Sequence, residues 1–213
     1  RITSLAYTDL FASLGQYFEI NELRVSWLGQ ELGLLQRLRD KDPTWSRIDG
    51  LNALIPHGLT EGLIGYQYFC PDMIGGGLDT GFYGGTFKGM DPELFVRWTQ
   101  ASALMPMMQF SYAPWRLEQK YVEICRKYAK LHAQLGDYIY DLALEAPKDG
   151  TPMVLPLFFR NPEDERCYLI SDQFLLGERF LVAPVLQKGA NSRDIYLPKG
   201  TWLDYWNGTI HQG

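Results

Sequence analysis

The pattern of apolar residues changes near Asp172, and this change constrains the fold more than any other feature of the chain. Before Asp172, segments with apolar residues at helical spacing alternate with short apolar runs that are typical of buried strands. After Asp172, short strand-like segments follow one another, separated by Gly, Pro and Asn. Strands that alternate with helices favour a parallel sheet or barrel, whereas strands alone favour an all-β domain.

The expected elements can be placed along the chain. Strands are predicted at residues 23–28, 66–74, 109–112 and 153–159, and later at 180–185, 194–197 and 201–206. Helices are predicted at residues 49–63, 91–106 and 117–142. The second helix has the clearest start, because Asp91 is a capping carboxylate that is followed by a proline in the first turn. A complete (β/α)₈ barrel needs roughly 250 residues, so the first part of the chain can hold only a portion of one.

Composition and charge limit the kinds of partner. The net charge of −5 and the pI of about 5.2 argue against a nucleic-acid partner, which would require a basic patch. Aromatic residues make up 14% of the chain, and although sugars pack on such rings, we expect most of them in the core. Cys70, Cys125 and Cys167 form an odd set without zinc spacing, which indicates at least one free thiol or a partner outside this span. The histidines have no ligand spacing either, so we expect no metal and no cofactor.

Three charged residues lie where predicted strands end. Arg24 is in the first strand, Asp40 is in a following loop, and Asp72 ends an apolar run. Chemistry in a barrel takes place at the carboxyl ends of strands, and an acid beside an arginine and a second carboxylate suits acid/base work at a sugar. From spacing alone, surface salt bridges explain Arg24 and Asp40 more simply. Asp72 is the exception, because an aspartate within an apolar strand is costly unless it is paired or functional.

The glycine-rich segment from Gly75 to Gly89 follows a predicted strand. Its spacing matches neither the dinucleotide-binding fingerprint nor the P-loop. We interpret it as a mobile loop rather than a phosphate site. The chain contains no Ser-His-Asp arrangement that would indicate another class of hydrolase.

Four segments together resemble a known family. Arg24 precedes Asp40 by sixteen residues, and Trp45 follows Asp40 by five. The other segments are Leu63-Ile-Gly-Tyr-Gln-Tyr-Phe-Cys-Pro-Asp72-Met-Ile-Gly-Gly, Phe95-Val-Arg-Trp-Thr-Gln-Ala-Ser-Ala-Leu-Met-Pro-Met-Met108 and Asp172-Gln-Phe-Leu-Leu-Gly-Glu-Arg-Phe-Leu-Val-Ala-Pro-Val185. Over nearly its whole length the chain resembles glycoside hydrolase family 31, which includes α-glucosidases and α-xylosidases. The resemblance implies the C-terminal part of a (β/α)₈ TIM barrel at residues 1–174, followed by the start of an all-β β-sandwich domain at residues 175–213.

The chain departs from the common family pattern around the predicted site. The family motif Gly-Asp-Asn is Arg39-Asp40-Lys41 here, and a Trp three residues before the Asp is replaced by Arg37. The family's Met-Arg-Asn-His is Met108-Gln-Phe-Ser111 here. These changes would reshape the pocket for the outer hydroxyls of the sugar. They resemble the branch of the myogenesis-regulating glycosidases and SITS-binding proteins, which is more similar to α-galactosidases than to glucosidases.

The resemblance implies roles for individual residues. Asp40 corresponds to the acid/base of a retaining α-glycosidase, and Arg24, Asp72 and Trp45 to substrate-binding residues. The family nucleophile lies farther upstream of the arginine than the 23 residues before Arg24, so we expect it outside this chain. The expected partner is an oligosaccharide or glycoside, with either α-galactosidase- or α-glucosidase-like activity. The alternative is an inactive relative that acts as a membrane-associated carbohydrate- or anion-binding protein.

Localisation is inferred from weaker signals. The chain begins at Arg1 without an initiator Met, and we expect it to be a fragment of a longer protein. It contains one N-glycosylation sequon, Asn207-Gly208-Thr209, in a turn-like stretch. We expect a protein of the secretory pathway, in the endoplasmic reticulum lumen or on the extracellular face. A membrane anchor outside this chain and a homo-oligomer are both left open by the sequence.

Overall fold

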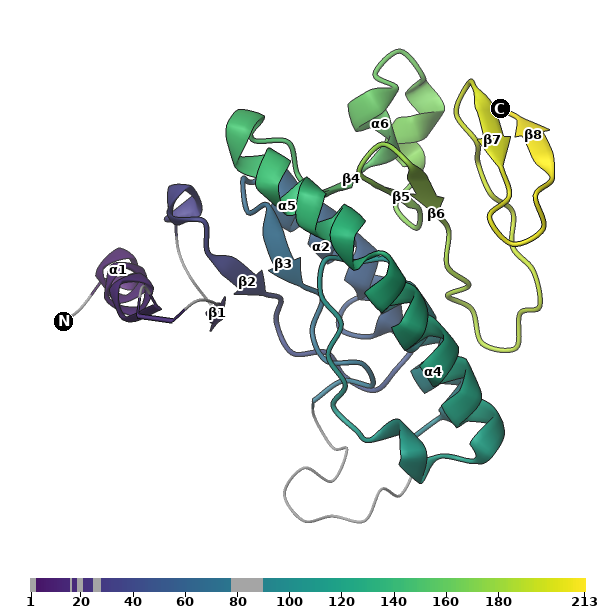
Figure 1. Ribbon diagram of the computed structural model, residues 1–213, viewed down its shortest axis with the longest axis horizontal. Helices are drawn as coiled ribbons and strands as arrows, with labels where there is room; N and C mark the ends of the chain where they lie inside the picture. Colours follow the sequence, from purple (N-terminus) through teal and green to yellow (C-terminus); the bar gives the residue numbers. More distant parts are fainter. Residues whose placement is uncertain (1–2, 16, 19–20, 25–27, 78–89) are drawn as a thin grey trace.

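A computed structural model of the protein describes residues 3–15, 17–18, 21–24, 28–77 and 90–213. Its helices are α1 (Ser4–Gly15), α2 (Leu54–Leu63), α3 (Pro92–Ser102), α4 (Gln119–Gln134), α5 (Gly136–Asp149) and α6 (Leu157–Arg160). Its strands are β1 (Glu22–Arg24), β2 (Leu35–Arg37), β3 (Tyr68–Cys70), β4 (Val154–Leu155), β5 (Phe174–Leu176), β6 (Phe180–Val182), β7 (Thr201–Leu203) and β8 (Ile210–Gln212). The 3₁₀ turns are η1 (Gln30–Leu32), η2 (Leu51–Ala53), η3 (Pro114–Arg116) and η4 (Glu165–Leu169). Figure 1 shows α1 at one side of the molecule, the β7–β8 hairpin at the other, and α4 with α5 running between them.

A parallel sheet positions the predicted site. Its strands lie in the order β1-β2-β3, and both pairings are parallel. Helix α2 connects β2 to β3 and packs closely on the sheet, because at Gly58 a Cβ would lie 2.7 Å from the Phe69 ring. Beyond β3, Ile74 forms an isolated parallel bridge with Phe110. The sequence predicts a strand at 109–112, but the structure has only this bridge there.

The remaining strands form antiparallel sheets. Strands β4, β5 and β6 form one sheet, and β7 pairs with β8 in a hairpin. Residues 180–206 contain no helix, as expected for an all-β segment. The domain boundary between residues 174 and 175 stays a prediction. Strand β4 precedes this boundary and pairs with β5, which begins at Phe174 and so spans it.

The main hydrophobic core joins the helices to the second sheet. It contains Trp98 and Phe95 of α3 together with Phe174 of β5, and each of these side chains is 0% exposed. Cys125 of α4 packs into the same cluster. Residues on both sides of the glycine-rich segment therefore share one interior, and this interior supports the strand ends of the parallel sheet.

Several predicted elements differ from those observed. The helix predicted at 117–142 is two helices that meet at Leu135 and Gly136, where a glycine weakens helix propensity, and the second continues to Asp149. The strand predicted at 153–159 is only β4, because Pro156 ends it and leads into α6.

Two further strand predictions also need correction. Residues 194–197 form no strand, since the backbone N–H of Tyr196 donates to the side-chain oxygen of Gln173 at 2.8 Å. Within the strand predicted at 23–28, β1 ends at Arg24, while residues 25–27 lie outside the described residues. Most of the Gly75–Gly89 segment, residues 78–89, also lies outside them.

Candidate active site

The parallel strands end side by side, and this edge assembles the predicted site residues. Arg24 closes β1 and pairs in register with Arg37, which closes β2 and pairs with Cys70 at the end of β3. Because the strands are parallel, their carboxyl ends meet at one edge of the sheet. Asp40 and Asp72 follow shortly after β2 and β3, so both lie in the loops at this edge.

Arg24 and Asp40 form an ion pair between Nη2 and Oδ2. Their side chains are 46% and 35% exposed, so the pair faces open space rather than the core. An arginine can hold a carboxylate in one orientation through charge-assisted hydrogen bonds. The ion pair therefore fixes where the Asp40 carboxylate lies at this edge of the sheet.

Asp72 is buried and strained. Its side chain is 0% exposed and its backbone has a φ of 83°, which is uncommon for a residue with a side chain. Its Oδ2 accepts the backbone N–H of Lys41 at 2.8 Å, and its Oδ1 accepts the Nε–H of Arg37 at 3.2 Å. The strand-end position thus places Asp72 beside the loop that carries Asp40. Both carboxylate oxygens of Asp72 are thus already bonded within the protein.

A row of connected polar and charged side chains, called here the charged ladder, crosses the same edge. The Nη1 of Arg37 lies 3.4 Å from Glu22 Oε1, so Arg37 bridges Glu22 on β1 and Asp72 after β3. The Nε2 of Gln109 donates to the other oxygen of Glu22 at 2.6 Å. Burial alone would lower the pKa of Arg37, but the hydrogen bond and charge of Asp72, with the charge of Glu22, raise it. The guanidinium therefore stays charged, as a half-buried cation between two carboxylates requires.

Sequence reasoning singled out Arg37 only as a departure from the family pattern and missed Glu22 and Gln109 as members of this ladder. Alternation along β1 is a signal that could have found Glu22, because residues two apart in a strand point to the same face. Glu22 and Arg24 are such a pair. No local signal connects Gln109 to Glu22, which is 87 residues away in the chain.

Trp45 and Asn207 lie apart from the Arg24–Asp40 pair. The indole N–H of Trp45 donates to Asp91 Oδ2 at 3.2 Å, and its ring packs against the main core. Asn207 lies in the exposed turn between β7 and β8, where its Nδ2 donates to Asp204 Oδ2 at 3.0 Å. The structure therefore joins Arg24, Asp40 and Asp72 at one edge and places Trp45 at the start of α3.

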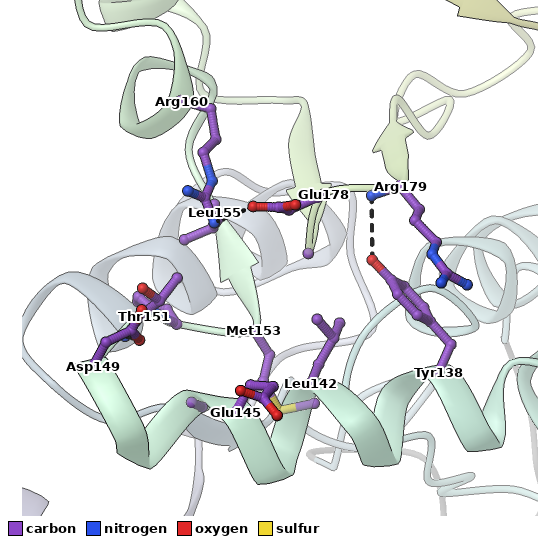
Figure 2. A pocket seen from close by; sticks show the side chains of 13 residues that line it. Tyr138, Leu142, Glu145, Asp149, Thr151, Met153, Leu155, Arg160, Glu178 and Arg179 are labelled. Atoms are coloured by element: carbon purple, nitrogen blue, oxygen red, sulfur yellow. Dashed lines mark hydrogen bonds and ion pairs between the residues drawn. The ribbon is translucent and has the colours of Figure 1, made fainter.

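A cavity of about 330 Å³ lies elsewhere, between α5 and the β4–β5–β6 sheet. Figure 2 shows Tyr138 and Leu142 of α5 facing Glu178 and Arg179 of the β5–β6 turn across it. The hydroxyl of Tyr138 donates to Leu176 O at 3.0 Å and accepts the backbone N–H of Arg179 at 3.2 Å. None of the predicted site residues lines this cavity, so it is not the site at the strand ends.

Within the described ranges, no three His, Cys, Asp or Glu side chains are grouped so that they could hold a metal ion. Cys70, Cys125 and Cys167 are all free and buried, and burial raises the pKa of Cys70 to about 11. A thiol with such a pKa is a poor nucleophile at neutral pH. In the part of the chain that the structure describes, no helix is both long and apolar enough to span a bilayer.

Comparison with known families decides the relationship of this chain. Residues 40–142 match the TIM-barrel domain of glycosyl hydrolases family 31, and residues 150–213 match the C-terminal domain of that family. The chain belongs to glycoside hydrolase family 31. The predicted fold class is confirmed, since the family's TIM-barrel domain is followed here by its C-terminal domain.

Individual family 31 relatives agree with this assignment. The myogenesis-regulating glycosidase of Mus musculus is 42% identical over 207 residues, which cover 96% of this chain and 28% of that protein. The SITS-binding protein of Tetronarce californica is 36% identical over 186 residues, which cover 85% of this chain and 26% of that protein. The predicted branch is therefore confirmed. The chain spans between a quarter and a third of the length of these two relatives.

Solved family 31 structures share the fold. A Flavobacterium johnsoniae family 31 dextranase complexed with glucose superimposes with a TM-score of 0.82 at 27% identity. The match covers 98% of this chain and 27% of the dextranase. This chain therefore shares the fold of the corresponding part of that dextranase.

Proposed function

We propose that the full-length protein is a retaining α-glycosidase and that this chain supplies its acid/base residue. The observation that carries the proposal is the ion pair of Arg24 with Asp40 at the carboxyl edge of the parallel sheet. Family 31 membership supports it, because the relatives include an α-glucosidase and an α-xylosidase. The nucleophile would lie upstream of this chain.

In the proposed reaction, the upstream carboxylate attacks the anomeric carbon while protonated Asp40 gives its proton to the leaving oxygen. Asp40 then takes a proton from the water that hydrolyses the glycosyl–enzyme bond. Arg24 would hold Asp40 in place and balance its charge after proton transfer. Arg24 and Asp72 would also bind sugar hydroxyls, the latter in exchange for its contact with Arg37. Trp45 would contribute the part of its ring that the core leaves exposed, since its N–H is bonded to Asp91.

The substrate class we propose is an oligosaccharide or glycoside with a terminal α-galactosyl or α-glucosyl unit. The full-length protein should be assayed on the 4-nitrophenyl α-glycosides of galactose, glucose and xylose. NMR of the first-formed sugar should show the α-anomer, since two displacements retain configuration. First formation of the β-anomer would contradict a retaining mechanism, and hydrolysis of none of these glycosides would remove the enzyme proposal.

An inactive, anion-binding relative is the second candidate. The observation in its favour is the sequence around Asp40, where Arg37, Arg39 and Lys41 are cationic residues that depart from the common family pattern. The similarity to a SITS-binding protein points the same way. Equilibrium dialysis of SITS against the full-length protein discriminates the two candidates: saturable binding without any glycoside hydrolysis would favour this one.

We also propose that the protein enters the secretory pathway. The exposed position of Asn207 in the β7–β8 turn supports this, because an oligosaccharide there would meet solvent. A membrane anchor or a homo-oligomer would involve segments or copies outside this chain. The glycosylation state of Asn207 in the full-length protein is the direct test.

A further inference from the structure

Lys41 is an unusual residue because its entire side chain is buried next to the proposed acid/base. Among the described residues, Lys41 and Asp72 are the two ionisable side chains of Asp, Glu, Lys or Arg that are buried, each with 0% exposure. Burying an ammonium group costs several kcal/mol unless hydrogen bonds and opposite charges offset it. Neither the core nor the proposed reaction, as described above, requires a lysine at this position.

The backbone of Lys41 connects the two loops of the site. Its N–H donates to Asp72 Oδ2 at 2.8 Å, and its carbonyl oxygen accepts the N–H of Gly77 at 3.0 Å. The loop after β2 is therefore attached to the loop after β3 on both sides of the Lys41 α-carbon. Gly76 permits this close approach, because a Cβ there would lie 2.5 Å from the Lys41 carbonyl oxygen.

The side chain of Lys41 adds a second constraint that spans Asp40. Its Nζ donates to the carbonyl oxygen of Arg39 at 2.7 Å. The side chain thus bonds back across the peptide units on either side of Asp40 and restricts their rotation. The carboxylate that these units carry is the one that pairs with Arg24. Restricting the backbone in this way limits the positions that the Asp40 carboxyl group can adopt.

Charged groups from three elements act on the Lys41 ammonium. Burial lowers the pKa of Lys41 to about 8; the charges of Asp72 and Asp40 oppose this effect, and the charge of Arg39 adds to it. Cys70 of β3 also lies near it, but as a neutral thiol at neutral pH. From α2, the pKa values of His57 and Glu61 both respond to the charge of Lys41. At neutral pH the group is therefore mostly protonated and keeps its hydrogen bond to Arg39.

We infer that Lys41 is a positioning residue for Asp40: its buried side chain holds the Arg39–Asp40–Lys41 backbone so that the acid/base carboxyl group faces the leaving oxygen. The inference rests on the proposed function. Lys41 touches neither substrate nor reacting atoms in this role. A lysine that only filled space would support folding, and its replacement would not selectively slow the reactions that need proton transfer. Comparing substrates that do and do not need a proton therefore distinguishes the two roles.

The test compares Lys41→Met with wild type in the full-length protein, since Met preserves the bulk of the side chain without its charge. Substrates are the 4-nitrophenyl glycoside that the wild type cleaves and the methyl glycoside of the same sugar, whose leaving group needs protonation. We expect kcat on the methyl glycoside to fall by about 10²-fold, the order that a small misplacement of a catalytic group produces. The loss on the 4-nitrophenyl glycoside should be clearly smaller, with KM little changed for both.

A double-mutant cycle separates positioning from general damage. If Lys41 acts through Asp40, adding Lys41→Met to Asp40→Asn should cause no further loss of kcat on the methyl glycoside. Lys130→Met removes an exposed lysine from α4 and serves as the matched control, which should retain wild-type kcat. Lys41→Gln retains a hydrogen-bond donor, so its loss of kcat should be intermediate. It provides the same comparison if the Lys41→Met variant does not fold.

The outcomes distinguish this inference from the proposed function. A wild type that hydrolyses none of the tested glycosides removes the proposed function and this inference together. Two results with an active wild type would overturn the inference alone. One is an equal loss of kcat on both substrates in the folded Lys41 variants. The other is a loss of kcat in the double variant that equals the product of the losses from Lys41→Met and Asp40→Asn. Circular dichroism and thermal unfolding of each variant identify those that are folded.

Discussion

Arg24 and Asp40 form an ion pair across the ends of two neighbouring parallel strands, sixteen residues apart in the chain. The pair exists because β1 and β2 run in the same direction, so the last residue of one faces the loop that follows the other. The loop after β3 adds a further constraint, since Asp72 binds the backbone N–H of the residue that follows Asp40. Three strands thus determine where one carboxyl group lies.

Asp40→Asn should remove the proton donor of the proposed reaction. We expect kcat of the full-length protein to fall by about 10²–10⁴-fold, most for substrates with poor leaving groups. Asp42→Asn is the matched control, because Asp42 lies in the same loop and precedes a proline, which indicates a turn residue. Kinetics on a glycoside with a good leaving group and on a disaccharide provide the measurement. Equal losses from the two substitutions would exclude Asp40 from the mechanism.

Asp72→Ala should destabilise the site strongly. The substitution leaves the N–H of Lys41 and the guanidinium of Arg37 without their buried acceptor, and breaking such a buried pair costs about 3–5 kcal/mol. Asp141→Ala changes an exposed carboxylate on α5 and should have little effect. Thermal unfolding of both variants measures the difference. A similar midpoint for the two would show that the contacts of Asp72 do not stabilise the fold.

Gly76→Ala should damage the site more than its backbone angle alone explains. Gly76 and Gly189 have nearly the same φ, 75° and 72°, so alanine is strained by about 1–2 kcal/mol at either position. Only at Gly76 would the new Cβ meet backbone, 2.5 Å from the Lys41 carbonyl oxygen, whereas nothing lies within 4 Å at Gly189. We therefore expect a larger fall in both the unfolding midpoint and kcat for Gly76→Ala. Equal effects in the two variants would count against close contact between the loops.

Asp91→Ala should weaken the start of α3 in a pH-dependent way. The Oδ1 of Asp91 accepts the N–H of Glu93 at 3.0 Å, and loss of such a cap costs about 1 kcal/mol. Burial raises the pKa of Asp91, but hydrogen bonds from Lys188 and Trp45 outweigh this effect and lower it below its ordinary value.

Because the folded-state pKa of Asp91 is lowered, its contribution is present in full above the unfolded pKa of about 4 and is lost as the pH falls through the folded value. The unfolding midpoints of wild type and Asp91→Ala should thus differ at pH 7 and converge in acid. Glu118→Ala is the control, since Glu118 precedes α4 without a side-chain capping bond. A difference between wild type and Asp91→Ala that persists unchanged at low pH would contradict this account.

Asn207 should carry an N-linked glycan when the full-length protein is made in a eukaryotic secretory pathway. The Asn207 side chain lies in the exposed β7–β8 turn, within a complete sequon. Removal of this glycan by an endoglycosidase should reduce the mass, and Asn207→Gln should abolish the shift at this site. Asn191→Gln, outside any sequon, should not change it. A peptide map with unmodified Asn207 in a secreted sample would contradict the prediction.

The sequence by itself determined the features that depend on near neighbours or on specific motifs. The start of α3 at Asp91 is local hydrogen-bond chemistry, the change from alternating elements to strands alone follows from residue periodicity, and the family follows from motif spacing. Where longer-range contacts compete with local preference, sequence reasoning failed: Tyr196 bonds to Gln173 instead of joining a strand.

Only the tertiary structure decided how the candidate site is built. Spacing indicated Arg24 and Asp40, but the partners of Asp72, the Glu22–Arg37–Gln109 contacts and the burial of Lys41 depend on which strand ends meet. A lysine within a polar loop sequence reads as a solvated residue. It is buried here in a position where its backbone bonds to the loop after β3 and its ammonium group bonds to the Arg39 carbonyl oxygen. These partners offset the loss of water that burial imposes on its polar groups.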